Sequence, residues 1–412
     1  METYGSLDIS YQYFFKEIEG RDPSRPRLTL SVKNSGELNK YWNYKLSPYF
    51  SYDGLSEVEE QETLFDVEEA YIEFEKNIFS FKLGWLQQNW GVTEGFDPAA
   101  VLQSYRLWNP LDMQALASPS LQATWSWSSS LFEVFMVSQR RKTELPQPKS
   151  RWLPEEYIDS ELVVDDNIIV LPSDPQYSYA SYEQMNKARE WNLGVRYFQT
   201  IDSFDFSLFF FEGASPVPLT QIGLTVDSVG VIDGKDAFFL GQDIQLTPID
   251  YRLRTLGGST VLSIGRSILR HAWHYQDAVG DNAAVPDWQR ANVLAWEFSP
   301  LASGKLISLF EYSNVERAGE LNSTVSSIGR IFDEAYLLGL RYELSEKWSL
   351  YGSYLYDSVY GDQVHNITVT GRIRDSLTLK LLWINIEEKD KSTALAGYTK
   401  NDQTVINLEY FF

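Results

Sequence analysis

Two histidines in the segment HAWH, His271 and His274, are the side chains whose types most suggest chemistry. Imidazoles at a suitable spacing bind a metal ion or transfer protons. These two are three positions apart, so on a strand they would point to opposite faces. We therefore expect that they do not ligate one ion together.

A serine hydroxyl beside a histidine is the other catalytic arrangement to consider. Ser263 and Ser267 lie close to His271 in the sequence, and a histidine base activates an adjacent serine. The sequence shows no nucleophile-elbow pattern and no recognisable acidic partner for such a pair. It also has no cysteine, which excludes thiol catalysis and cysteine-bound zinc on this chain. We expect neither an enzyme nor a bound cofactor.

Many segments of the chain have the alternating pattern of β-strands. Phe79, Phe81, Leu83 and Trp85 would share one face of a strand, with polar residues between them on the other. No segment approaches the roughly 20 consecutive apolar residues of a membrane helix, whereas a membrane strand needs only about 10 residues with every second one apolar. The same alternation recurs in residues 42–52, 191–197, 204–210 and 336–344.

Short and long connections alternate along the chain, which indicates the topology. Short turns are expected at 75–77, 127–130, 200–203, 263–267, 299–304, 345–347 and 374–376. Long polar stretches lie at 53–63, 89–118, 140–187, 214–250, 277–287, 315–331 and 388–400. Such an order is typical of a closed antiparallel transmembrane β-barrel, and we predict one domain over 1–412 with about 18 strands, within 16–20. The first strand is expected at 5–17 and the last at 402–412, paired with each other.

Acidic residues outnumber basic ones, 57 to 35, giving a formal net charge of -22. Binding to nucleic acid is therefore not expected, because a phosphate-binding surface needs the opposite sign. Acidic residues concentrate in the predicted external loops. One hypothesis is that Glu57, Glu59 and Glu60 bind divalent cations that bridge to lipopolysaccharide phosphates; a solvated acidic surface is the alternative.

The chain resembles bacterial outer-membrane β-barrel proteins of the porin type, and more weakly alginate-export-like barrels. The resemblance is carried by the hairpin at 70–91, by NPLD at 109–112 and by the C-terminal strand. It implies the outer membrane of Gram-negative bacteria, contact with its lipid and lipopolysaccharide, and a homotrimer as one oligomeric state. It also implies that Leu408, Tyr410 and Phe412 form the signal read by the barrel-assembly machinery. No charged-then-apolar leader follows Met1, so for an exported chain we expect that the signal peptide has been removed.

Charged residues on the face opposite to the apolar one are expected to line the lumen. They are Lys45, Glu73, Lys82, Arg196, Asp205, Arg270, Glu297, Arg341, Glu343 and Lys380. Either they create a field that selects ions, or they form salt bridges that stiffen the wall. The resemblance further implies that loop 89–118 folds inward as a constriction, with Asp97, Arg106, Trp108 and Asp112; a surface cap over the barrel mouth is the alternative.

These observations lead to three functional hypotheses. The first is a channel for passive diffusion of small hydrophilic solutes or ions, with a mild preference for cations. The second is a structural sleeve around a partner threaded through the lumen, such as a multihaem cytochrome or an exported polymer. The third is a specific sugar channel that uses inward rings such as Tyr49, Phe209 and Tyr351.

Overall fold

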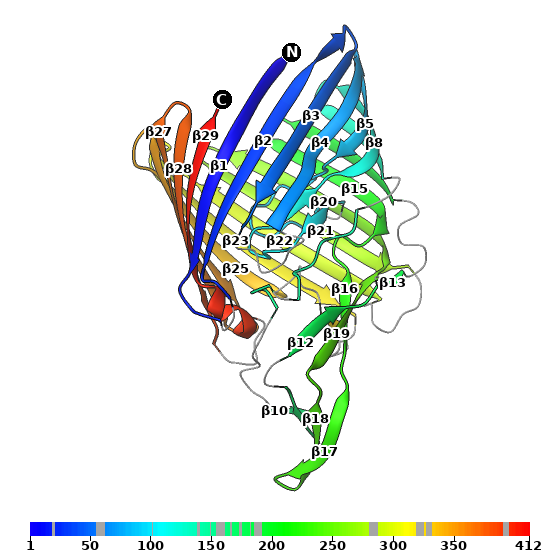
Figure 1. Ribbon diagram of the computed structural model, residues 1–412. Helices are drawn as coiled ribbons and strands as arrows, with labels where there is room; N and C mark the ends of the chain where they lie inside the picture. The colour runs from blue at the N-terminus through cyan, green and yellow to red at the C-terminus, as the bar shows by residue number, and fades with distance from the viewer. Residues whose placement is uncertain are drawn as a thin grey trace.

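A computed structural model shows the chain as a closed β-barrel (Figure 1). It describes residues 1–18, 21–54, 62–100, 102–137, 141–148, 150–153, 161–164, 167–172, 175–181, 183–184, 192–279, 287–318, 325–326, 332–389 and 395–412. Among them is a short 3₁₀ helix, η1 (Ala396–Asn401). In the described part of the chain, no helix is both long and apolar enough to cross a membrane.

Eighteen strands form one antiparallel sheet, and each pairs with its two neighbours. They are β1 (Glu2–Phe14), β2 (Ser24–Asn39), β3 (Trp42–Tyr52), β4 (Thr63–Lys76), β5 (Phe79–Leu86), β8 (Ser118–Trp127), β9 (Ser130–Val137), β14 (Asn192–Ile201), β15 (Phe204–Ala214), β20 (Arg252–Ile264), β21 (Ser267–Ala278), β22 (Trp288–Phe298), β23 (Leu306–Arg317), β25 (Glu334–Glu343), β26 (Trp348–Asp357), β27 (Gln363–Arg374), β28 (Leu377–Glu387) and β29 (Gln403–Phe411). β1 pairs with β29, which closes the sheet. The predicted fold class is therefore confirmed, although the first strand begins and ends three residues earlier than expected.

The predicted turns lie at the barrel end that carries both chain termini in Figure 1. Several of these turns contain a residue with positive φ that reverses the chain tightly, such as Asn77 (φ 56°) between β4 and β5 and Asp202 (φ 51°) between β14 and β15. The longer connections lie at the other end. The alternation of connection lengths follows directly, because neighbouring antiparallel strands begin and end at alternate ends of the barrel.

Two small sheets extend from the barrel at the end away from the termini (Figure 1). One contains β10 (Glu161–Val164), β11 (Asn167–Val170), β17 (Val226–Ile232) and β18 (Lys235–Leu240). The other contains β12 (Gln176–Tyr179), β13 (Glu183–Gln184), β16 (Leu219–Gly223), β19 (Asp243–Asp250) and β24 (Val325–Ser326). None of these strands joins the barrel sheet. The strand-like residues between 214 and 250 thus belong to the external connections.

Strand register divides the barrel residues into two faces. Leu294 on β22 and Leu256 on β20 are about half exposed on the outside. On the inward face of the same strands, Ala295 and Thr255 are buried. The wall therefore has an apolar outer surface and a mixed inner surface, as strict alternation requires.

The pairing of β1 with β29, called the seam below, joins residues about 400 positions apart. Gly5 and Phe412 exchange two backbone hydrogen bonds, with N···O distances of 2.8 and 3.0 Å. The ring of Phe412 lies over Gly5, where a Cβ atom would come within 2.5 Å of Phe412 Cζ. Tyr410 stacks on Phe412 with ring centroids 6.3 Å apart. Glycine at position 5 thus leaves the space in which the terminal ring packs across the seam.

We predict that Gly5→Val weakens the seam, because its side chain would displace the Phe412 ring. The expected loss in free energy of unfolding is about 1–3 kcal/mol, which is typical of overpacking. The measurement is denaturant unfolding of the barrel in detergent. Gly352→Ala is the matched control, since a Cβ atom there meets nothing nearer than a backbone oxygen at 3.9 Å. Equal stability of the two variants would contradict the prediction.

Candidate functional site

The connection between β5 and β8, residues 87–117 and called the inner loop below, enters the lumen. Within it β6 (Ser104–Arg106) pairs with β7 (Gln114–Leu116). Three groups of contacts hold the loop, and they come from opposite sides of the barrel wall. The barrel interior around the loop is therefore the candidate functional site.

Trp90 holds the start of the inner loop against β9, β14 and β15. Its indole Nε1 donates a hydrogen bond to Glu133 Oε1 at 2.6 Å, and its ring lies 5.5 Å from that of Phe209. The ring fits there because position 194 is glycine: a Cβ atom on Gly194 would come within 2.7 Å of it. The guanidinium of Arg196 lies 5.5 Å from the centre of the Trp90 ring. Buried residues of this cluster are Leu86, Trp90, Ala99, Leu102, Phe135, Val137, Phe209 and Phe211.

Glu311 on β23 holds the middle of the inner loop. Its side chain is completely buried, and its carboxylate accepts the backbone N–H groups of Glu94, Gly95 and Phe96 at 3.2, 3.1 and 2.6 Å. Burial deprives this carboxylate of its hydrogen bonds with water, and three convergent N–H donors replace them. Gly95 permits this approach, because a Cβ atom there would lie 2.6 Å from Leu337 Cδ2.

His274 and Phe96 complete the contacts with the far wall. His274 Nδ1 donates to the carbonyl oxygen of Pro98 at 2.6 Å, which assigns the proton to Nδ1. Phe96 packs edge-on against Phe332, with ring centroids 6.5 Å apart. Because Trp90 contacts β9 and β15 while Phe96 and Pro98 contact residues on and near β21 to β25, the inner loop crosses the lumen.

A cluster of four charges joins the end of the inner loop to β4 and to the connection after β9. Arg106, only 3% exposed, pairs with Asp66 at 2.8 Å and with Glu144 at 2.6 Å. Arg141 binds the same Asp66 carboxylate with both terminal nitrogens, at 2.8 and 2.9 Å. Arg106 also donates to the hydroxyl of Tyr49 at 2.5 Å. We call Asp66, Arg106, Arg141 and Glu144 the arginine–carboxylate cluster.

Two ionisable groups of the inner loop have shifted pKa values. Burial raises the pKa of the Asp97 carboxyl to about 6, and a hydrogen bond from the Ala99 N–H opposes this only partly. Burial acts to lower the pKa of Arg106, but hydrogen bonds and the charge of Glu144 and Asp66 outweigh it and hold that pKa above its ordinary value. Arg106 therefore stays charged, whereas Asp97 changes charge near neutral pH.

The predicted constriction residues do not form one group. Arg106 and Trp108 lie together, with the guanidinium 4.8 Å from the ring centre. Asp97 instead packs against Gly91, where a Cβ atom would overlap its carboxylate. Asp112 is exposed in a turn and donates its N–H to Asn109 O at 3.0 Å.

The ten charged residues predicted to line the lumen lie on the inward face by strand register. Six of them take part in four ion pairs: Lys45 with Glu69 (2.6 Å), Lys82 with Glu73 (3.7 Å), Arg196 with Glu133 (3.7 Å) and Arg270 with Glu297 (2.9 Å). Arg341 lies 5.9 Å from the centre of the Tyr351 ring. Their role in conduction stays a prediction. Glu57, Glu59 and Glu60 lie outside the described residues.

The catalytic arrangements considered from the sequence are not assembled. His271 pairs in register with Leu294 on the outward face, and His274 with Ala291 on the inward face. Ser267 shares the face of His271 but is four residues away, about 13 Å along a strand. Ser263 lies on the inward face. Over the ranges that the structure describes, no group of three His, Asp or Glu side chains could hold a metal ion.

Sequence reasoning did not assign to Trp90, Glu133, His274 and Glu311 the role of holding the inner loop. A partial signal existed for the two glutamates, because each falls at an inward position beside apolar inward residues, such as Phe135 beside Glu133 and Leu309 beside Glu311. A buried carboxylate needs donors. The sequence does not reveal that these donors are an indole and backbone N–H groups of a distant loop.

Comparisons with known proteins give matches among solved structures only. No family model matches this chain, and no curated protein does. An engineered variant of the porin of Rhodopseudomonas blastica matches with a TM-score of 0.44 and 9% identity, and another with 0.45 and 8%. Each comparison covers 100% of this chain and 99% of the porin. We infer function from the geometry of this chain.

Removing the Glu311 carboxylate should release the middle of the inner loop, because three backbone N–H groups lose their acceptor. The chain has no cysteine, so Ala99→Cys introduces a single thiol at a position that is 1% exposed. We expect rapid maleimide labelling of this thiol in the Glu311→Ala background and slow labelling otherwise. Glu297→Ala, which removes an inward carboxylate paired with Arg270, is the control. Similar labelling rates in the Glu311→Ala and Glu297→Ala backgrounds would contradict this role of Glu311.

The raised pKa of Asp97 predicts a pH-dependent contribution to stability. The folded protein binds this proton more tightly than the unfolded chain, so stability is greatest below the ordinary value of 3.8 and falls as the pH rises to about 6. Asp97→Asn keeps the oxygen that accepts from Ala99 and cannot ionise. At pH values above 6, this variant should therefore have a higher midpoint of unfolding than wild type. At low pH, the two midpoints should differ little. A lowered midpoint above pH 6 would show that the charged form of Asp97 is stabilising.

Proposed function

We propose that this chain is an outer-membrane channel of the porin type that passes small hydrophilic solutes or ions by passive diffusion. One observation carries the proposal: a closed wall has an apolar outer face and a charged inner face, and a loop is held across its lumen by buried carboxylates. An apolar cylinder fits lipid, and charged inward residues fit water. The outer membrane of a Gram-negative bacterium is the location that follows.

The inner loop supports a size limit for the channel. Its contacts with Glu133, Glu311 and His274 are made by buried groups, so the loop is held as part of the wall. A loop fixed across the lumen narrows the path for every solute. The polar groups that face the remaining space then decide which ions pass.

A mild preference for cations is proposed from the distribution of acidic residues. β4 places Glu69 and Glu73 on the inward face, where each pairs with a lysine. Within each of these pairs the two charges cancel. The chain as a whole still has a net charge of -22, and its acidic residues concentrate in the predicted external loops. A negative field at the mouth raises the local concentration of cations.

The inner loop argues against the two other functional hypotheses. A threaded cytochrome or polymer would need the space that the loop crosses. The rings named for sugar binding are already engaged: Tyr49 accepts from Arg106, Phe209 is 2% exposed beneath Trp90, and Tyr351 lies under Arg341. An open diffusion channel needs none of these groups to be free.

Assembly and partners are also proposed. Leu408 and Tyr410 lie on the outward side of β29, the strand that closes the barrel, and Phe412 directly follows this strand. Recognition of these three residues by the barrel-assembly machinery is compatible with that position. A homotrimer and cation-bridged contacts with lipopolysaccharide remain predictions from the resemblance.

Planar-bilayer recording in a salt gradient tests the channel. We expect steady conductance and a reversal potential that favours the cation. Glu73→Gln should shift the reversal potential toward chloride, because it leaves the Lys82 charge unpaired on the inward face. Glu316→Gln is the matched control: its partner Arg290 lies with it on the outward face, and the change in charge is the same. Absence of conductance, or a wild-type preference for chloride, would contradict the proposal.

A further inference from the structure

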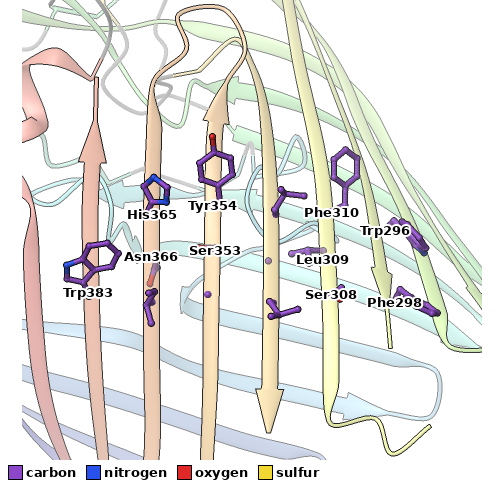
Figure 2. A pocket seen from close by; sticks show the side chains of 15 residues that line it. Trp296, Phe298, Ser308, Leu309, Phe310, Ser353, Tyr354, His365, Asn366 and Trp383 are labelled. Carbon is purple, nitrogen blue, oxygen red and sulfur yellow. The ribbon is translucent and has the colours of Figure 1, made fainter. Parts of the chain in front are cut away.

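The hairpin of β17 and β18 projects from the barrel end away from the termini (Figure 1). It carries exposed apolar side chains: Val229 and Val231 are 64% and 68% exposed. Exposed rings on the barrel wall, such as Trp296 and Trp383 beside the outer groove (Figure 2), face lipid in the membrane location given above. The valines lie beyond the wall, so the membrane does not account for their exposure.

A two-residue turn fixes the register of this hairpin. Asp233 and Gly234 both have positive φ, 51° and 79°, as a type I′ turn requires. Ile232 and Lys235 flank this turn and are register partners. A turn of this kind makes its flanking residues a hydrogen-bonded pair. The pairs farther along the hairpin can therefore be counted from Ile232.

The backbone groups of Val229 and Val231 point to the outer edge of β17. Pairs with and without hydrogen bonds alternate along an antiparallel ladder. Counting from Ile232 makes Val231–Asp236 and Val229–Phe238 pairs without hydrogen bonds. Both valines thus direct their N–H and C=O groups away from β18, and among the described strands only β18 pairs with β17. This edge therefore offers hydrogen-bonding groups to an additional strand.

The valine side chains lie on the less covered face of the hairpin. Register partners share a face, so Val229 lies beside Phe238. On the opposite face, the ring of Phe239 lies over Gly230, where a Cβ atom would come within 3.1 Å of Phe239 Cε2. Proteins usually protect an edge strand with proline or a charged residue, and residues 228–232 contain neither. The edge is therefore suited to strand pairing.

Carboxylates surround this apolar edge. Asp227 precedes it, Asp233 follows it in the turn, and Asp236 is the register partner of Val231; all three are exposed. Lys235 is the one basic residue between positions 226 and 240. Pairing of β17 with a second copy of itself would bring two such acidic sets together, which is unfavourable. A strand with basic residues at its ends has the complementary charge.

We propose that β17 is a docking edge for an extended segment of a partner protein outside the barrel. The segment adds a strand to the sheet, with apolar residues opposite Val229 and Val231 and basic residues at its ends. Backbone hydrogen bonds to the two valines supply affinity, and the flanking charges select the partner and fix its register. The channel requires none of these residues, so this surface adds a second function to the chain.

A labelled peptide tests the docking edge. The capped sequence KTVTVTK has valines at alternate positions and lysines at its ends, and fluorescence anisotropy measures its binding to the full chain in detergent. Val229→Pro removes an N–H that points to the partner and leaves the pairs with β18 in place, a position where proline is tolerated. We expect affinity weaker by at least about tenfold, equivalent to about 1.4 kcal/mol. Val229→Thr keeps the N–H and is the matched control, with affinity close to that of wild type.

A second variant tests the charges without a proline. Asp227→Asn with Asp233→Asn keeps the side-chain size, and asparagine tolerates the positive φ at position 233. The loss of two exposed charge pairs should weaken binding of KTVTVTK about fivefold. The peptide ETVTVTE, with acidic ends, should bind wild type more weakly than KTVTVTK does.

Four results would overturn the docking edge. They are no saturable binding of KTVTVTK by wild type, equal affinities of Val229→Pro and Val229→Thr, binding of ETVTVTE as tight as that of KTVTVTK, and a multimer of wild type that Val229→Pro converts to monomers. The last result would assign this edge to a second copy of the chain. Bilayer conductance tests the channel separately, and Val229→Pro should leave it unchanged.

Discussion

Every other feature of this protein depends on the backbone pairing between β1 and β29. An unpaired strand edge in hydrocarbon costs several kcal/mol for each exposed N–H or C=O group, so an apolar sheet of this kind persists in lipid only when it is closed. Closure fixes which side chains face out and which face in. It also brings Gly5 beside Phe412, where glycine leaves space for the terminal ring.

Closure creates an interior that the inner loop then divides. The chain has no cysteine, so no disulfide holds this loop. Buried carboxylates do so instead: Glu133 accepts from an indole, and Glu311 accepts from three backbone N–H groups. Each is stable only while its donors remain in place, because an unpaired buried charge is strongly unfavourable. The loop and the wall therefore depend on each other, and the size limit proposed for the channel follows from this dependence.

Much of the fold could be predicted because strand alternation and turn chemistry are local. Phe79 to Trp85 alternate within one strand, and Asn77 marks the turn before it. Closure was predictable from matching apolar faces at the two ends of the chain. The contacts of the inner loop were not, since they join Trp90 to Glu133 and Phe96 to Glu311 across long stretches of sequence.

A disulfide across the seam tests closure most directly. Ser10 and Asn407 are register partners on the inward face, and counting from the hydrogen-bonded pair Gly5–Phe412 makes them a pair without hydrogen bonds. Such pairs have Cα atoms about 4.5 Å apart, within the range for a disulfide. On oxidation in detergent, the double variant Ser10→Cys/Asn407→Cys should form an intramolecular disulfide in nearly every molecule, whereas Ser10→Cys/Val405→Cys should not. Failure to crosslink, or crosslinks mainly between molecules, would contradict a closed barrel.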